Sequence, residues 1–235
     1  MASGYKLTLL LTRRPDLSPE QFADAWLALD RRYPLILPGL ERYVFNRALS
    51  ANSPIAGAAD SPYDAVIETW WTRKNSVADW VVTREFDEQW LPPRRALLAE
   101  TPAAVAGEPI IVWEREVTED MSPVTLIVLP AARRRLRLTE FAEYWTGAHA
   151  ELALAGEATQ RRLVRLEDTP APLASPSRFT RTRHDGVGAL TFASMEALAA
   201  EFSSSHYRDV VAPDEIRFTD PAYSSAFLGS PIDLT

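Results

Sequence analysis

The chain has 235 residues, of which 46% are hydrophobic and 24% charged, and a formal net charge of −7 at pH 7. This balance argues against nucleic acid or an anionic membrane as a partner, and the absence of cysteine excludes disulfides, thiolate metal sites and a cysteine nucleophile. The apolar run at residues 7–11 is too short for a signal peptide or a membrane span. The composition therefore predicts a globular protein of the cytoplasm.

The first half of the sequence predicts six elements. After a β-rich run, Ser18 and Pro19 mark a helix start, with Ser as the N-cap and Pro in the first turn. Apolar residues then recur at helical spacing until Pro34 ends the run. The predicted elements are a strand at 5–11, the helix from Ser18 to Pro34, strands at 40–49 and 63–71, a helix at 76–84 and a strand at 109–113.

The second half predicts the same order. Its elements are a strand at 124–129, a helix at 139–152, strands at 162–166 and 185–192, a helix at 194–202 and a weaker closing stretch at 216–218. Each half therefore reads β-α-β-β-α-β, which is the ferredoxin-like split unit.

An aromatic motif recurs in the first predicted helix of each half. It spaces three residues by four, and it returns 119 residues further on. The two copies are Phe22, Trp26 and Asp30, and Phe141, Trp145 and His149. Such a repeat predicts a tandem duplication, with one domain at 1–117 and a second at 118–235.

The repeat continues beyond the helix. A Pro/Ala/Ser-rich stretch at 50–62, and again at 169–177, precedes a strand that begins with Asp64 in one half and Asp185 in the other, at an offset of 121. In each copy both helices would cover one face of an antiparallel sheet and leave the other face bare. We therefore expect an α+β fold in which the two sheets pack against each other within one chain.

Three segments resemble the EthD family, which is named for ethyl tert-butyl ether degradation and belongs to the dimeric α/β-barrel superfamily. They are the helix that carries Trp145 and His149, the strand start Pro62-Tyr63-Asp64 with Glu68 inside the strand, and residues 213–220. The resemblance implies an intramolecular dimeric α/β barrel of two ferredoxin-like repeats, in which the duplicated chain replaces a homodimer. Relatives include cofactor-independent monooxygenases, cyclases, decarboxylases, lactone isomerases and haem enzymes, so the fold leaves the reaction open.

Each half keeps a different part of the polar pair that the resemblance implies. His149 matches the family's helix histidine, and its counterpart in the first half is Asp30. Glu68 matches the family's strand glutamate, and its counterpart in the second half is Ala189. The pattern is consistent with one asymmetric site or with two decayed ones.

His149 is the first candidate for chemistry. It shares a helical face with Phe141 and Trp145, so its imidazole should point to an apolar interior, where it could move a proton near neutral pH. The alternative is a core histidine bonded to a backbone carbonyl. Tyr144 and Asp185, together with Glu68, are candidates for orienting the imidazole.

Two carboxylates are further catalytic candidates. Glu68 lies in a strand that otherwise reads as buried, so it requires either a partner such as Arg42 or a polar cavity. A structural ion pair or an exposed edge position is the alternative. For Asp30, which two arginines follow, the alternative is a solvated helix end.

Aromatic residues supply the strongest hint of a ligand. Trp70 and Trp71 should point to opposite faces of one strand, and Trp26 and Trp145 lie on equivalent helices. Such a wall suits a flat apolar or aromatic substrate, although aromatic residues at this spacing also build ordinary cores.

Two residues are candidates for a cavity mouth. Tyr63 and His184 each stand directly before an Asp-led strand, at equivalent positions of the two halves. The three histidines of the chain show no metal-ligand spacing, so we expect no metal site.

These residues favour an enzyme that acts on a small hydrophobic or aromatic carbonyl or polyketide-like compound by cofactor-independent acid–base chemistry. Decarboxylation, isomerisation, cyclisation and oxygenation stay open. One alternative is a haem-binding oxidoreductase of the same superfamily, which needs a histidine as axial ligand. Another is a non-catalytic binding or scaffold protein. A homodimer of the duplicated chain is left open.

Overall fold

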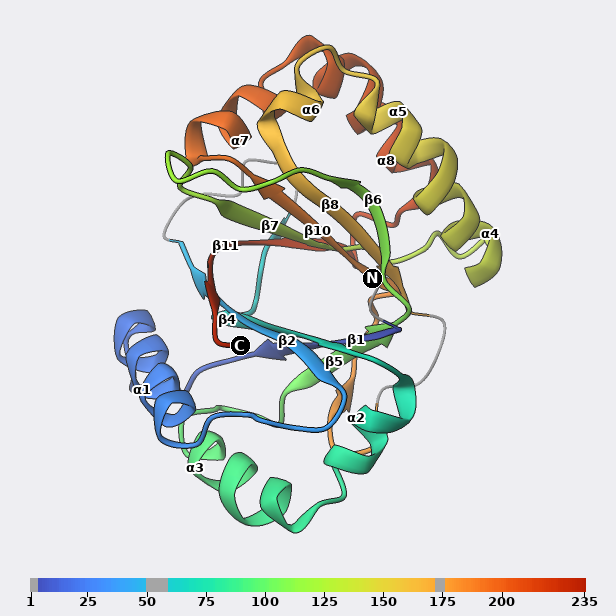
Figure 1. Cartoon of the computed structure of the whole chain (residues 1–235). Helices are drawn as coiled ribbons and strands as arrows, with labels where there is room; N and C mark the ends of the chain where they lie inside the picture. Colours follow the sequence, from blue (N-terminus) through green and yellow to red (C-terminus); the bar gives the residue numbers. More distant parts are fainter. Residues whose placement is uncertain (1–3, 50–58, 172–175) are drawn as a thin grey trace.

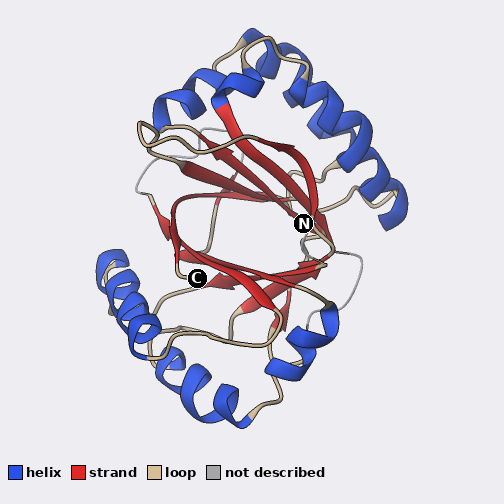
Figure 2. Cartoon of the chain, in the orientation of Figure 1, coloured by secondary structure: helices blue, strands red, loops and turns tan. Residues whose placement is uncertain are grey.

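The computed structural model describes residues 4–49, 59–171 and 176–235. In this part of the chain eleven strands form one continuous sheet, which curves so that its two halves face each other (Figure 1). Figure 2 shows the resulting layers, with helices outside each half of the sheet. Most of the stretch at 50–62, and residues 172–175, lie outside the described residues. None of the described helices has the length and apolar character needed to cross a bilayer.

The elements follow the predicted order with additions. The first half has β1 (Tyr5–Leu11), α1 (Pro19–Arg32), β2 (Leu40–Ala48), β3 (Ala59–Asp60), β4 (Ala65–Trp71), α2 (Lys74–Trp80), a π-helical turn (Phe86–Trp90), α3 (Leu91–Arg95), β5 (Ala103–Gly107) and β6 (Ile110–Glu114). The second half has β7 (Val124–Leu129), α4 (Leu138–Tyr144), a π-helical turn (Trp145–His149), α5 (Ala150–Leu154), α6 (Thr159–Arg162), β8 (Leu163–Pro170), β9 (Thr180–Arg181), β10 (Gly186–Phe192), α7 (Met195–Phe202), a π-helical turn (Tyr207–Val211), α8 (Ala212–Phe218) and β11 (Ser225–Asp233).

The first helix begins where the sequence predicts. The Ser18 hydroxyl accepts a hydrogen bond from the backbone N–H of Gln21, and the Gln21 side chain accepts one from the backbone N–H of Ser18. This reciprocal capping box satisfies two N–H groups that have no partner within a helix. The apolar face of α1 then buries Phe22 and Trp26 completely.

The two halves of the sheet have the same strand order. It is β2-β4-β1-β5 in the first half and β8-β10-β7-β11 in the second, and every one of these ladders is antiparallel. A duplicated unit would produce this agreement. The duplication itself stays a prediction.

The strand predicted at 109–113 is present but does not close the first half, and the closing stretch predicted at 216–218 is not a strand. Residues 110–114 form β6, which pairs with β8 of the second half, whereas β5 closes the first half against β1. Residues 216–218 belong to α8, and the closing strand of the second half is β11. Both true closing strands have weak strand signals, because β5 consists of small residues and β11 contains a glycine and a proline.

Strands cross between the halves at two places. The first part of β11 pairs with β7, and from Gly229 onward it pairs with β2 of the first half. The strand β6 makes the opposite crossing to β8. The boundary between 117 and 118 stays a prediction, although strand pairing joins the two halves across it.

Candidate active site

His149 and Asp214 form a buried pair in the second half. His149 ends the π-helical turn that follows α4, and Asp214 lies in α8. Nδ1 of His149 is 2.9 Å from Oδ2 of Asp214, and the side chains are 11% and 5% exposed. Tyr144 donates a hydrogen bond of 2.6 Å to Oδ1 of the same carboxylate. Tyr144 and His149 are therefore linked by hydrogen bonds to the same carboxylate, an arrangement in which Tyr144 could help to orient the imidazole.

The protonation of this cluster follows from its surroundings. Burial lowers the pKa of His149, although Asp214 acts in the opposite direction. Burial would raise the pKa of Asp214, but the hydrogen bonds from Tyr144 and His149 hold it below its usual value. Near pH 7 we therefore expect an ionised Asp214 and a neutral imidazole. Because a carboxylate only accepts hydrogen bonds, the proton of His149 belongs on Nδ1, which leaves the lone pair of Nε2 available.

The local backbone contributes to this arrangement. The sequence predicts one continuous helix at 139–152, but its middle is a π-helical turn, Trp145–His149. Such wide turns occur frequently at functional sites. The ring of His149 packs against Phe218, with 4.7 Å between the ring centroids.

His149 lines a cavity of about 340 Å³ between β7, α8 and the start of β11. Apolar side chains such as Val128, Trp145 and Phe218 make up most of its wall. A more enclosed space of about 80 Å³ shares His149 and Trp145 and adds Asp168 on β8. An apolar cavity with a few converging polar groups is typical of small-molecule sites.

The first half fills the space that corresponds to this cavity. Asp168 pairs with Gly188 in the second half, and the register places Phe45 opposite Ile67 at the equivalent positions. Phe45 and Ile67 are fully buried, and Trp26 stacks on Phe45 with 6.4 Å between centroids. Trp26 therefore belongs to a packed core, whereas its counterpart Trp145 borders a cavity.

The prediction of a solvated Asp30 was wrong. Asp30 is 5% exposed, lies 2.5 Å from Nη2 of the buried Arg94 and accepts a hydrogen bond of 3.0 Å from Tyr43. Burial raises the pKa of Asp30, and Arg94 opposes that rise. The first half thus holds an Asp–Arg ion pair where the second half holds His149 and Asp214.

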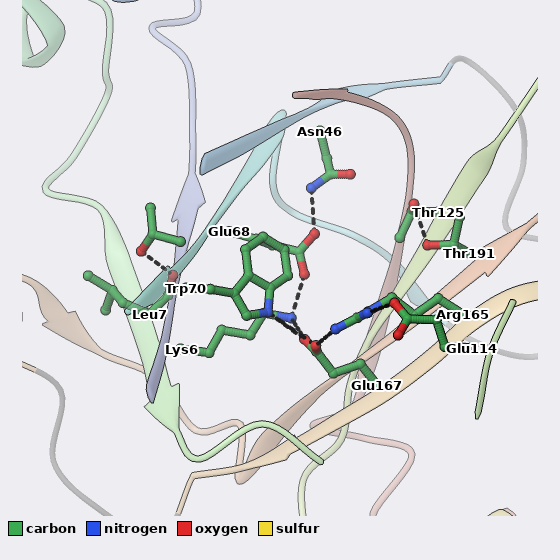
Figure 3. Close-up of polar contacts among 11 residues, drawn as sticks. Lys6, Leu7, Asn46, Glu68, Trp70, Glu114, Thr125, Arg165, Glu167 and Thr191 are labelled. Atoms are coloured by element: carbon green, nitrogen blue, oxygen red, sulfur yellow. Dashed lines mark hydrogen bonds and ion pairs between the residues drawn. The ribbon is translucent and has the colours of Figure 1, made fainter. Parts of the chain in front are cut away.

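Glu68 lies in a buried charge cluster between the two halves (Figure 3). Its Oε1 is 2.6 Å from Nζ of Lys6, and Asn46 donates a hydrogen bond of 2.8 Å to its Oε2. Lys6 also reaches Glu167 of the second half at 2.7 Å. Glu68 therefore does not orient His149. Its contacts with Lys6 and Asn46 are instead those of a structural ion pair, the alternative given for Glu68 in the sequence analysis.

The predicted partner of Glu68 was also wrong. Arg42 pairs with Asp233 at 2.9 Å instead, and both side chains are partly exposed. Trp70 donates its indole N–H to Glu167, 3.0 Å from Oε1, so it faces the charge cluster. Trp71 points the other way, into the core of the first half, which confirms the predicted alternation.

The remaining candidates lie near the strand starts. Tyr63 and His184 meet across the two halves, with 3.4 Å between Oη and Nε2. Asp185 accepts a hydrogen bond of 2.8 Å from the backbone N–H of Ala132 and is not bonded to His149. Among the described residues no group of three or more His, Cys, Asp or Glu side chains is arranged to hold a metal ion.

Three acidic residues in or beside the cavity were missed as site residues. Asp214 and Glu215 lie in the segment 213–220 that carries the family resemblance, but that segment was expected to contain a strand. Asp168 follows Glu167 at the end of an apolar strand. Consecutive acidic residues in a buried strand point to opposite faces, and this signal could have indicated that each faces a polar site.

The family model of the EthD domain matches residues 133–222. Residues 133–222 are therefore similar to an EthD domain. The matched segment includes His149, Asp168 and Asp214, and so covers the cavity walls that the π-helical turn Trp145–His149, β8 and α8 supply. A search of curated proteins found no match to the sequence.

Solved structures similar to the whole chain show the fold around this matched segment. An anthrone oxidase-like protein has a TM-score of 0.68 at 9% identity, with 99% of this chain and 92% of that chain covered. A predicted monooxygenase from Fusobacterium nucleatum has a TM-score of 0.62 at 8% identity, covering 98% and 93%. A variant of chlorite dismutase from Candidatus Nitrospira defluvii has a TM-score of 0.56 at 9% identity, covering 100% and 93%. The chain thus shares the mixed α+β fold of these structures.

Proposed function

We propose that this protein is an enzyme that transfers protons on a small hydrophobic or aromatic carbonyl compound without an organic cofactor. The observation that carries the proposal is the pair formed by His149 and Asp214 at the wall of an apolar cavity. Asp214 fixes the tautomer of the imidazole, and the apolar wall lowers its pKa, so Nε2 is a base near neutral pH.

In the proposed step Nε2 of His149 removes a proton from a carbon that is next to the substrate carbonyl or conjugated with it. The electron pair of the broken C–H bond forms a C=C bond, and the carbonyl π pair moves to oxygen. Protonation of the oxygen completes an enolisation, return of a proton to the same carbon gives exchange, and its return to another carbon completes an isomerisation. Decarboxylation, cyclisation and oxygenation of such a substrate also pass through an enol or enolate, which is why the site alone does not choose among them.

Two further observations support the proposal. The names of two similar structures, an anthrone oxidase-like protein and a predicted monooxygenase, refer to enzymes. The equal strand order of the two halves supports two ferredoxin-like repeats that form an intramolecular barrel. In this arrangement the second repeat holds the site, and the first completes the sheet.

The test is hydrogen exchange at the methylene group of anthrone, followed by NMR in D₂O, with simpler aryl ketones in parallel. We expect exchange faster than in buffer for at least one ketone, and its loss in His149→Ala at an unchanged melting temperature. Buffer-level exchange for every ketone would contradict the proposal. Equal exchange by the variant would remove His149 from it and favour the non-catalytic alternative.

Haem is the second candidate, because Nε2 of a histidine held by a carboxylate is suited to bind iron. The cavity supplies this histidine ligand, but its lining does not suit the propionate groups of haem. Haem carries two propionates, yet no Lys or Arg lies among the residues that line the cavity of about 340 Å³, and Glu215 does. An absorption spectrum with added haemin tests this alternative, since a Soret band lost in His149→Ala would favour haem.

A further inference from the structure

Asp168 faces the enclosed space of about 80 Å³ that His149 also lines, and it does so from the opposite wall, the sheet. In β8 its neighbour Glu167 points between the two halves toward Lys6, so Asp168 points toward the helices. Gly188 lies beside it. A Cβ at position 188 would lie 3.1 Å from Oδ1 of Asp168 and 3.1 Å from the ring of Trp145. The missing side chain thus leaves room for the carboxyl group and the indole together.

The carboxyl group of Asp168 is buried without a partner. The residue is 2% exposed, and among the residues that the structure describes neither oxygen has a hydrogen bond or an ion pair. A buried polar group in this state costs free energy unless something else satisfies it. The neighbouring acid Glu215, in contrast, accepts a hydrogen bond of 3.2 Å from Tyr207.

Several charges act on Asp168. Its pKa is raised to about 8, mainly by burial. The Glu167 carboxylate adds to this rise, and Lys6 opposes it. On the cavity side it shares the space with His149 and Tyr207 of the π-helical turns, Glu201 of α7 and Glu215 of α8. No cation lies among the residues lining that inner space. Near pH 7 Asp168 is therefore mainly a neutral acid, which can donate a hydrogen bond.

We propose that Asp168, which faces His149 across the cavity, donates its proton to the carbonyl oxygen of the substrate. The substrate class that we propose is a flat aryl ketone whose enol is a phenol. The inference rests on the proposed function and deepens it, because it assigns the second of the two groups that enolisation requires. Asp168 would be a catalytic residue, since it touches the reacting oxygen.

The step balances between the two walls of the cavity. His149 takes the proton from carbon, and the carbonyl oxygen takes the proton of Asp168 as its π bond opens. The products are an enol, an imidazolium ion and an aspartate, whose opposite charges compensate each other. Reversal at the same carbon gives exchange, and return at another carbon gives an isomer. No oxidant or reductant is needed.

The test is the affinity for 2-naphthol, a stable mimic of such an enol, measured by calorimetry near pH 7. We expect Asp168→Asn to weaken binding about tenfold or more, the effect of one lost hydrogen bond in a dry site. The matched control is Asp233→Asn, which changes a partly exposed carboxyl group that pairs with Arg42 away from the cavity, and its affinity should stay within about threefold of the parent. Equal affinity for Asp168→Asn and the parent would overturn the inference.

This outcome is distinct from failure of the proposed function. If the parent exchanges ketone protons while Asp168→Asn binds naphthol and exchanges as well as the parent, only the role of Asp168 falls. If the parent exchanges no ketone, the proposed function fails and takes this role with it. Should Asp168→Asn fail to fold, the infrared spectrum of Glu215→Gln decides. A carboxylic acid band near pH 7 that shifts with naphthol supports the inference, and its absence overturns it.

Discussion

Nζ of Lys6 in β1 lies 2.7 Å from Oε1 of Glu167 in β8, so a buried cation of the first half neutralises a buried carboxylate of the second. The same ammonium group also neutralises Glu68. Charges at 0–3% exposure are tolerated only because they meet in this cluster. The two halves are thus joined by buried ion pairs as well as by strands of one half that pair with strands of the other.

Lys6→Met should destabilise the protein strongly. It leaves Glu68 and Glu167 buried without their shared cation, and breaking a buried pair costs about 3–5 kcal/mol. Urea unfolding measures the change. Arg42→Met is the matched control, because the pair of Arg42 with Asp233 is partly exposed and should contribute about 1 kcal/mol or less. Equal losses in the two variants would contradict the cluster's structural role.

Arg94→Met should reduce stability and leave the chemistry intact. It strands Asp30 in the core of the first half, which costs on the order of 3–5 kcal/mol. The cavity lies in the other half, so ketone exchange by the folded fraction should match the parent. Loss of exchange at a temperature where the variant is folded would show that the first half takes part in the reaction.

Asp214→Asn should slow ketone exchange by about 10- to 100-fold, because the imidazole loses the group that sets its tautomer. The carboxylate raises the pKa of His149, so its removal should lower that pKa further. The acid limb of the exchange profile should therefore move to lower pH. A rate profile and an NMR titration of the imidazole measure both effects. An unmoved limb would argue against His149 as the base.

Gly188→Ala should close the cavity. Its Cβ would lie 2.6 Å from a methyl carbon of Val128 and 3.1 Å from Asp168, so the neighbours must shift. We expect the affinity for 2-naphthol to fall by about tenfold or more. Gly147→Ala is the control, because a Cβ there meets nothing within 4 Å, and a helical alanine should add about 0.5–1 kcal/mol of stability. Full naphthol affinity in Gly188→Ala would place the ligand elsewhere.

Asp168→Asn should change how stability depends on pH. The pKa of Asp168 is about 8 in the folded protein, above its value in the unfolded chain, so between these two values the folded state binds more protons. The contribution of Asp168 to the free energy of unfolding therefore falls as pH rises from about 4 to 8. The variant lacks this loss. Its melting temperature relative to the parent should therefore rise across that range. A constant difference would mean that Asp168 is ionised in the folded protein.

Part of the site could be predicted because periodicity identifies faces. The spacing of Trp145 and His149 places both on one helix face, and the structure puts both at the cavity. Asp214 escaped prediction because it lies 65 residues further along the chain, in a helix that follows a π-helical turn. Lys6 escaped because a single lysine in an apolar strand looks exposed until two distant carboxylates surround it.

The sequence by itself determined the first five main elements of each half, strand, helix, strand, strand and helix, together with the capped start of α1 and the aromatic helix faces, because each depends on neighbours a few residues apart. Only the tertiary structure decided which strands close each half, that Asp30 meets Arg94 while His149 meets Asp214, and that the cavity lies beside Gly188. The physical reason is that pairing, burial and pKa depend on groups that folding brings together from distant positions, and local spacing carries no record of them.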